Sequence, residues 1–183
     1  YDLAAVRDEK EGGRWEIRRD AQNKPILQKS QPPEILFIER AIQLLKPGSG
    51  RMAMVIPNGI LNNPSLAYVR QWLLTKVQLL AVVDMHRDLF QPGNDTQTSM
   101  VVMRRLTARE EEIAQQSGLD YPIFMAIADK IGHDKRGNTL YRRNDDGSDV
   151  LVKKHETIRE IDQSTGKEII KEVDVTDRLV DDE

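Results

Sequence analysis

The chain has 183 residues, a net charge of −3, a pI near 5.7, and 39% hydrophobic but only 5% aromatic residues. This length suffices for one domain with a largely aliphatic core. The acidic balance argues against free-standing, non-specific DNA binding, because such binding depends on neutralisation of phosphates by Lys and Arg. The lack of cysteine excludes a disulfide framework and a thiolate zinc site.

The sequence also lacks the marks of a metal site and of a membrane protein. The three histidines, His86, His133 and His155, lie far apart in the sequence, so we predict no metal site. No apolar run approaches the length of a membrane span, and no signal peptide is visible. We therefore expect no membrane contact and a cytoplasmic location.

Three regions differ in composition, and we predict boundaries at 31/32 and 144/145. Residues 1–31 are polar and are interpreted as a loop or insertion before the core, although Trp15 and Ile17 alternate with polar residues as in a short hairpin. Residues 32–144 hold the regular apolar patterns. Residues 145–183 are highly charged and form either a hairpin or a partly ordered extension.

The apolar spacing from residue 34 onward predicts a helix, a sharp stop and a buried strand. The helical stripe consists of Ile35, Leu36, Ile38, Ala41, Ile42 and Leu45. Pro47 and Gly48 end the helix, because proline disfavours helical geometry before it and glycine adopts the left-handed terminating conformation. The unbroken apolar run at 52–56 predicts a strand covered on both faces, as in a parallel sheet.

A second helix and further strands follow. Asn63 is a good N-cap and Pro64 a good first helical residue, so we predict a helix that reaches about Lys76. The apolar run at 79–83 predicts a strand parallel to the preceding one. The gap before the next strand, at 99–103, is too short for a crossover helix, so these two strands are predicted to be antiparallel.

Beyond this point the patterns are shorter. We predict a charged helix at 108–118, a strand at 122–128 and a turn at 134–137. If the charged extension is a hairpin, a turn at 164–167 joins its strands at 157–162 and 168–173.

The segment FIERAIQLLKPGSGRMAMVIPNGIL resembles the modification subunit of type I restriction–modification systems, an N6-adenine DNA methyltransferase that uses S-adenosylmethionine. The similarity continues through NNPSLAYVRQWLLTKVQLLAVVDMHRDLFQPGNDTQTSMVVMRR and IFMAIADKIGHDKRG, in the family's order, over roughly residues 25–145. A helix that ends in LLKPG is common to many methyltransferases, whereas the ordered set is specific. The resemblance implies an α/β fold, namely the C-terminal half of a Rossmann-like methyltransferase domain with parallel strands and a terminal antiparallel strand.

Two motifs of that family are missing from this chain. The glycine-rich cofactor loop is absent, and so is the Asn-Pro-Pro-aromatic tetrapeptide, since the only Pro-Pro pair, Pro32-Pro33, precedes a helix. The chain also begins at Tyr1. We therefore expect a carboxyl-terminal part of a catalytic domain, inactive alone, whose S-adenosylmethionine pocket is complete only in a longer parent.

The resemblance makes Phe90 the main candidate for the catalytic site. In related amino-methyltransferases an aromatic residue before the last strand stacks on the flipped adenine, and here the context is Leu89-Phe90-Gln91-Pro92. Enzymes that modify a base in duplex DNA extrude it and stack it against apolar surface. The alternative is a phenylalanine that plugs the end of the sheet.

Two further residues are candidates through the same resemblance. In related enzymes an aromatic residue at the place of Phe37 lines the adenine pocket of S-adenosylmethionine, where a ring supplies stacking; the alternative is an ordinary core residue. Asn58 either borders the DNA-side cleft or forms the turn after the strand. The chain also has a basic cluster that consists of Lys135, Arg136, Arg142 and Arg143. This cluster either contacts phosphate or a partner subunit, or it is a solvated face.

These observations lead to two hypotheses of different class. The first is an enzyme part: the modification subunit of a type I system, an adenine-specific, site-specific DNA methyltransferase. Its partners are then DNA, a specificity subunit, a second modification subunit and, where a nuclease is coupled, a restriction subunit. The second is a non-catalytic assembly module that contacts DNA or protein. A glycine-rich loop and the tetrapeptide upstream of Tyr1 in the parent distinguish the first from the second.

Overall fold

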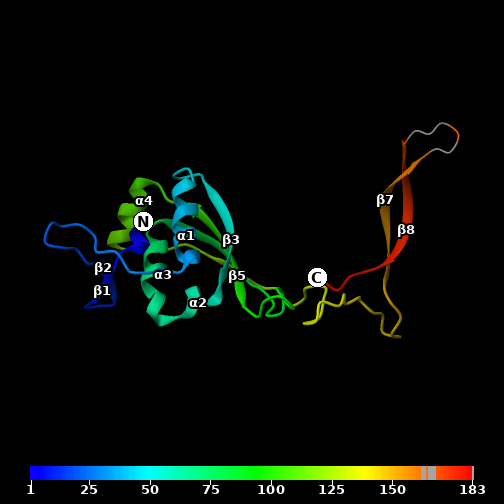
Figure 1. The fold of residues 1–183 in the computed structure, drawn as a ribbon, viewed down its shortest axis with the longest axis horizontal. Coiled ribbons are helices and arrows are strands. Elements are labelled where there is room, and N and C mark those ends of the chain that lie inside the picture. Colours follow the sequence, from blue (N-terminus) through cyan, green and yellow to red (C-terminus); the bar gives the residue numbers. More distant parts are fainter. Residues whose placement is uncertain (162–163, 165–167, 183) are drawn as a thin grey trace. The chain divides into compact units, whose positions relative to one another are not determined.

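The computed structural model describes residues 1–161, 164 and 168–182. The chain forms two compact units (Figure 1), which are described separately. The first comprises Tyr1–Arg87 and Thr96–Ala128, and the second comprises Asp88–Asp95 and Asp129–Glu183. The sequence-based boundaries at 31/32 and 144/145 stay a prediction.

Helix α1 (Pro33–Leu44) and strand β3 (Arg51–Pro57) form where the sequence predicts them. The buried side of α1 consists of Ile35, Ile38, Glu39 and Ile42. The chain leaves the helix before Pro47, as predicted, but Leu45 of the predicted stripe is already extended, so Gly48 is not the residue that ends the helix. Gly48 lies in the turn that follows, with a φ of 79° that glycine adopts without strain. Its N–H donates to the carbonyl of Arg105 at 3.1 Å, which joins this turn to the sheet.

Two short helical turns connect β3 to the next helix. These are α2 (Asn58–Asn62) and the 3-10 helix η2 (Pro64–Leu66), and α3 (Ala67–Leu74) follows directly. The side-chain oxygen of Asn63 accepts the N–H of Ser65 at 3.0 Å, so the predicted cap at Asn63 is confirmed. No helix among the described residues is long and apolar enough to cross a membrane.

Strands β4 (Val77–Asp84), β5 (Thr98–Arg105) and β6 (Phe124–Ile127) complete a four-stranded sheet in the order β3-β5-β4-β6. Strand β5 is antiparallel to both β3 and β4, whereas β6 is parallel to β4. The predicted antiparallel pair is confirmed. Because β3 and β4 run in the same direction with β5 between them, the α/β fold with parallel strands and an antiparallel strand is confirmed.

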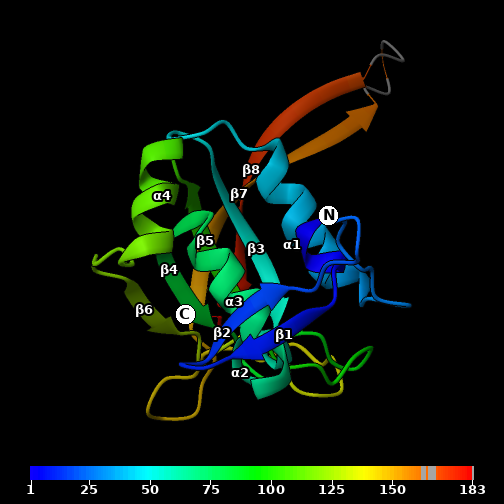
Figure 2. The same ribbon diagram turned by 90° about the vertical axis from the view of Figure 1, so that its left-hand side faces the viewer.

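Helices α1 and α3 lie on the same side of this sheet (Figure 2). The side chains packed between them and the sheet include Ile56, Val69, Val101 and Met103. Alternate residues of β3 point away from the helices, and Val55 among them is 47% exposed. The prediction that this strand is covered on both faces is therefore wrong for this unit, because both neighbouring helices pack on one face.

Helix α4 (Ala108–Gln116) is attached to the end of β5 by charged side chains. The hydroxyl of Thr107 accepts the N–H of Glu110 at 3.2 Å, and the Glu110 carboxylate accepts the N–H of Thr107 at 2.8 Å, which completes a capping box. Arg104 donates to the same carboxylate at 2.7 Å. The Arg104 hydrogen bonds, followed by the Thr107 N–H, lower the pKa of Glu110 to about 2.

The chain before α1 contains an antiparallel hairpin of β1 (Arg7–Lys10) and β2 (Arg14–Ile17). A short 3-10 helix, η1 (Asp2–Ala4), precedes it and is held by the buried Glu39 of α1. The carboxylate of Glu39 accepts the N–H of Asp2 at 2.6 Å and the N–H of Leu3 at 2.8 Å. These bonds, with the burial of Leu3, make the first residues part of the core.

The second unit contains the long antiparallel ribbon of β7 (Leu151–Ile161) and β8 (Glu168–Arg178). The hairpin alternative for the charged extension is thereby confirmed, while residues 165–167 of its predicted turn lie outside the described residues. The predicted turn at 134–137 is also confirmed, since the N–H of Gly137 donates to the carbonyl of Asp134 at 2.9 Å. No described residue of this unit belongs to the buried hydrophobic cluster.

Candidate functional site

Polar side chains gather where the parallel strands β3 and β4 end. Asn58 directly follows β3, and Asp84 is the last residue of β4. Strand β5 begins between them, with Ser99 paired to Ile56 on one side and to Asp84 on the other. We name Asn58, Asp84 and Ser99 the carboxyl-edge cluster. In open α/β sheets this edge is where ligands bind.

Hydrogen bonds join the three members of the carboxyl-edge cluster. The side-chain amide of Asn58 donates to Oδ1 of Asp84 at 3.1 Å. The hydroxyl of Ser99 lies 2.8 Å from Oδ1 of Asn58 and 3.2 Å from Oδ1 of Asp84, and its single proton serves one acceptor at a time. Ser99 is buried, while Asn58 and Asp84 are half-buried. The Asp84 carboxylate is thus oriented by neutral donors and still reaches solvent.

This arrangement is suited to orienting a polar ligand. The Ser99 hydroxyl contacts an amide and a carboxylate. Beside it, the buried hydroxyl of Thr98 has no hydrogen-bond partner in the part of the chain that the structure describes. Buried polar groups are normally hydrogen-bonded. The edge therefore holds one half-buried carboxylate, Asp84, that can contact a ligand.

Sequence reasoning identified Asn58 but missed Asp84 and Ser99. A signal for Asp84 existed, because it directly follows the apolar run at 79–83, just as Asn58 follows the preceding strand. Ser99 gave no such signal. Its place depends on the register of β5 against both neighbours, which the sequence pattern does not specify.

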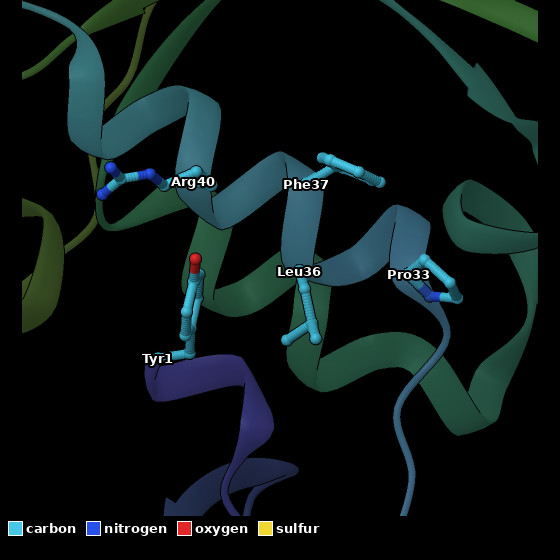
Figure 3. Close-up of a pocket in the computed structure, with 5 residues that line it drawn as sticks. All are labelled: Tyr1, Pro33, Leu36, Phe37 and Arg40. Carbon is cyan, nitrogen blue, oxygen red and sulfur yellow. The ribbon is translucent and has the colours of Figure 1, made fainter.

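Phe37 lies on α1 outside the buried side of the helix and is 67% exposed, so it is not an ordinary core residue. Figure 3 shows it beside a hollow of about 220 Å³. The hollow is lined by Tyr1, Pro33, Leu36, Phe37 and Arg40. Ligand pockets usually measure about 300–1,000 Å³. The hollow is therefore smaller than a usual ligand pocket, and Leu36 and Phe37 give it an apolar wall.

Phe90 lies in the second unit, within Asp88–Asp95. Phe90 is 44% exposed. The carbonyl of Phe90 accepts the N–H of Asn94 at 2.9 Å, and the N–H of Gln91 donates to the carbonyl of Asp88 at 3.0 Å. The ring thus projects from a locally closed turn, and its stacking role stays a prediction.

Within the first unit, the structure places Phe37 and Asn58 in different sites. The hollow beside Phe37 and the carboxyl-edge cluster that contains Asn58 share no residue, although both belong to the first unit. The basic cluster belongs to the second unit, and two of its members face aspartates. Arg142 lies 3.7 Å from Asp181, and Arg143 lies 3.8 Å from Asp149. Part of its charge is therefore already matched within the chain.

Part of the chain matches a known protein family. Residues 12–90 match the family described as Eco57I restriction-modification methylase. The resemblance drawn from the sequence is confirmed over this segment, which contains Phe37, Asn58, Asp84 and Phe90. Ser99 lies outside the methylase match.

Solved structures similar to the chain include three whose descriptions concern restriction–modification systems or methyltransferases. One, from work on complex assembly and conformational transition of the type I R-M system, is 25% identical with a TM-score of 0.47, and the match covers 68% of this chain and 24% of that one. A second structure is assigned as a class I S-adenosylmethionine-dependent methyltransferase from Listeria monocytogenes. It is 14% identical with a TM-score of 0.42, and the match covers 55% of this chain and 29% of that one.

The third is assigned as a modification subunit of a type I restriction enzyme from Vibrio vulnificus YJ016. It is 20% identical with a TM-score of 0.39, and the match covers 79% of this chain and 26% of that one. The matches thus span about a quarter of the length of these structures. No curated protein matches the chain.

Proposed function

We propose that this chain is part of a site-specific DNA methyltransferase, the modification subunit of a type I restriction–modification system. The reaction is transfer of a methyl group from S-adenosylmethionine to N6 of adenine in DNA. The observation that carries the proposal is the methylase match of residues 12–90. It is supported by the carboxyl-edge cluster, whose Asn58 and Asp84 belong to this segment and lie at the ligand-binding edge of the sheet.

The proposed partners are DNA, a specificity subunit and a second modification subunit, with a restriction subunit where cleavage is coupled to modification. The proposed location is the cytoplasm, where the DNA substrate of such a system lies. The cofactor supplies the methyl group when it is bound to the longer parent. Because the hollow beside Phe37 encloses too little volume for the whole cofactor, the remaining walls come from the rest of the parent.

Each candidate residue of this chain has a proposed task. The ring of Phe90 stacks on the extruded adenine, which its 44% exposure permits. Phe37 provides a flat apolar wall for the adenine ring of the cofactor. Asn58 and Asp84 border the DNA-side cleft and orient a polar group there, since an ionised carboxylate accepts hydrogen bonds from amino groups.

The reaction itself is tested with the full-length parent and its specificity partner. The complex is incubated with DNA and S-adenosylmethionine, the DNA is digested, and the methylated nucleosides are identified by mass spectrometry. We expect N6-methyladenine, and no product from the 183-residue chain alone. A product methylated on cytosine would contradict the adenine assignment. Methylation by the 183-residue chain alone would contradict the proposal that this chain is only one part of the catalytic domain.

The role of Phe90 is tested by Phe90→Ala in the same complex. A base–aromatic stack is worth about 1–3 kcal/mol per base. We therefore expect methylation to slow by roughly tenfold to a hundredfold, at about 1.4 kcal/mol per decade. Phe90→Trp is the matched control and should retain much of the rate. Because Phe90 is 44% exposed, the melting temperature should change little. An unchanged rate, or a large fall in melting temperature, would remove Phe90 from the site.

A second candidate function, a non-catalytic assembly module, is favoured by the ribbon of β7 and β8. Most residues of both strands are exposed on both faces of the ribbon. An isolated two-stranded hairpin is only marginally stable in water, so such a ribbon is suited to packing against a partner. A parent complex that binds DNA but never produces methyladenine would favour this candidate over the first.

A further inference from the structure

The first unit contains a larger pocket that takes no part in the proposed methyl transfer. It measures about 480 Å³, within the usual range for ligand sites. It lies between the β1–β2 hairpin and α3, which are adjacent in Figure 2. Its lining includes Arg7, Arg14, Trp15, Tyr68, Gln71 and Trp72. None of its residues belongs to the carboxyl-edge cluster or to the hollow beside Phe37.

Flat rings make up much of the pocket wall. Both tryptophans of the chain, Trp15 and Trp72, line it together with Tyr68. The rings of Trp15 and Tyr68 have centroids 5.9 Å apart and are tilted by 54°, so the buried Tyr68 supports the ring of Trp15 from one side. The two tryptophans are half-buried and keep part of their surface open to the pocket. In a chain with few aromatic residues, this concentration favours a flat ligand that stacks.

Two guanidinium groups lie beside these rings. The guanidinium of Arg7 lies 5.4 Å from the centroid of the Tyr68 ring, and one of its nitrogens donates to the carbonyl of Asp2 at 2.9 Å. Its Nε is buried and has no hydrogen-bond partner among the described residues. Arg14 is exposed and forms no ion pair within the described part of the chain. Glu16 is the one carboxylate in the lining. Asp2 and Glu39 lie close enough to Arg7 to match part of its charge, and Asp2 also accepts the indole N–H of Trp72 at 3.3 Å, so Arg14 supplies the exposed positive charge of the pocket.

We propose that this pocket binds a nucleotide, either free or within single-stranded nucleic acid. The base stacks on the half-buried ring of Trp15 or Trp72. The phosphate accepts hydrogen bonds from Arg7 and Arg14, whose planar guanidinium groups match phosphate geometry. A nucleotide is favoured over an acidic peptide because it supplies a flat ring and an anionic group together. The inference does not depend on the proposed methyl transfer.

The two tryptophans make the test direct. Because both line the pocket, tryptophan emission of the chain reports on this place alone. The 183-residue chain is titrated with deoxyadenosine monophosphate, with a five-nucleotide single-stranded oligodeoxyadenylate, and with a short glutamate peptide. We expect saturable quenching by both nucleotide ligands. Equal affinities identify a free nucleotide as the ligand, whereas tighter binding of the oligonucleotide identifies a strand.

The variants separate this pocket from a general charge effect. Arg14→Gln changes an exposed residue, so the fold is retained, and we expect the affinity to fall by roughly tenfold because one charge-assisted contact is lost. Arg51→Gln, which removes an exposed arginine at the start of β3, is the matched control and should leave the affinity unchanged. For the oligonucleotide, a plot of the logarithm of the affinity against the logarithm of the salt concentration should have a slope of about −0.7 for each phosphate contacted.

The proposal is overturned if neither nucleotide quenches the emission at millimolar concentration. It is also overturned if Arg14→Gln and Arg51→Gln weaken binding equally, because the effect would then reflect overall charge. Binding of the glutamate peptide with no binding of nucleotides would assign the pocket to an acidic protein segment instead. These results are independent of methylation, so the failure of either proposal leaves the other standing.

Discussion

The centre of the first unit and the ribbon of the second unit are stabilised in different ways. Between α1, α3 and the sheet, side chains such as Ile38 and Met103 are almost wholly buried. In the ribbon, Ile161 and Ile170 are 72% and 64% exposed. The two ribbon strands pair over eleven positions, with ion pairs such as Lys171–Glu160 across them, but no described residue of the ribbon joins the hydrophobic cluster.

This contrast shows that regular secondary structure alone says little about stability. Burial of apolar surface supplies most of the stabilisation of a fold, and cross-strand pairs at exposed positions contribute much less. Substitutions in the first unit should therefore have large effects, and comparable substitutions in the ribbon small ones. The following predictions test that contrast in order of decreasing effect.

The largest difference is expected between two isoleucines in different surroundings. Ile38→Ala should cost about 2–5 kcal/mol of stability, because its side chain is 1% exposed and leaves a cavity. Ile170→Ala, at an exposed ribbon position, should stay within about 0.5 kcal/mol. Urea unfolding followed by circular dichroism measures both. Equal losses in the two variants would mean that the ribbon is packed as tightly as the core.

A smaller loss is expected from Glu39→Gln. The substituted amide has only one acceptor oxygen, so the N–H of either Asp2 or Leu3 loses its partner at the buried site. A buried unsatisfied donor costs about 1–3 kcal/mol. Glu34→Gln, an exposed carboxylate in the first turn of the same helix, is the control and should cost less. Thermal unfolding measures the loss of stability in both variants. Equal losses would mean that the hydrogen bonds of Glu39 contribute no more than an exposed carboxylate does.

The capping carboxylate Glu110 should give the first unit an acid-sensitive contribution. Its pKa is about 2 in the folded chain, against about 4.3 in an unfolded chain, so folding favours the charged form. The stabilisation is therefore complete above about pH 5 and is lost as the pH falls toward the folded pKa. Glu110→Gln should cost about 1 kcal/mol near neutral pH. The difference in free energy of unfolding between wild type and variant, measured by urea unfolding at several pH values, should become smaller below pH 5. A difference that is independent of pH would contradict this prediction.

The smallest effect is expected in the ribbon ion pairs. Lys171 and Glu160 contact each other at 2.8 Å, yet both side chains are more than half exposed. Solvent screens such pairs, and the ordering of two long side chains opposes them. Lys171→Ala should leave the melting temperature unchanged, at low and at high salt. A measurable fall would show that the ribbon depends on its charged ladder.

Much of the fold was predictable because its signals are local. The stripe of α1, the stop before Pro47, and the apolar runs of β3 and β4 each depend on residues a few positions apart. The antiparallel pairing of β5 followed from the short connection before it. The hairpin in the charged extension could be stated only as one of two alternatives, because its pattern of apolar residues is weak.

The candidate site was predictable only in part. Asn58 stood out because it follows a strand, but its partners lie 26 and 41 residues away at Asp84 and Ser99. The burial of Glu39 and the pocket beside Trp15 and Trp72 were likewise invisible in the sequence pattern. Each depends on packing between elements that are remote along the chain.

The sequence by itself determined helices α1, α3 and α4, strands β3, β4 and β5 with their relative directions, and the resemblance to restriction–modification methylases. These follow from apolar periodicity, proline and glycine positions, and the order of short motifs. Only the tertiary structure decided which face of β3 is covered, which polar groups meet at the carboxyl edge and where the aromatic pocket lies. Those features are set by strand register and helix packing, which bring together side chains that no local pattern relates.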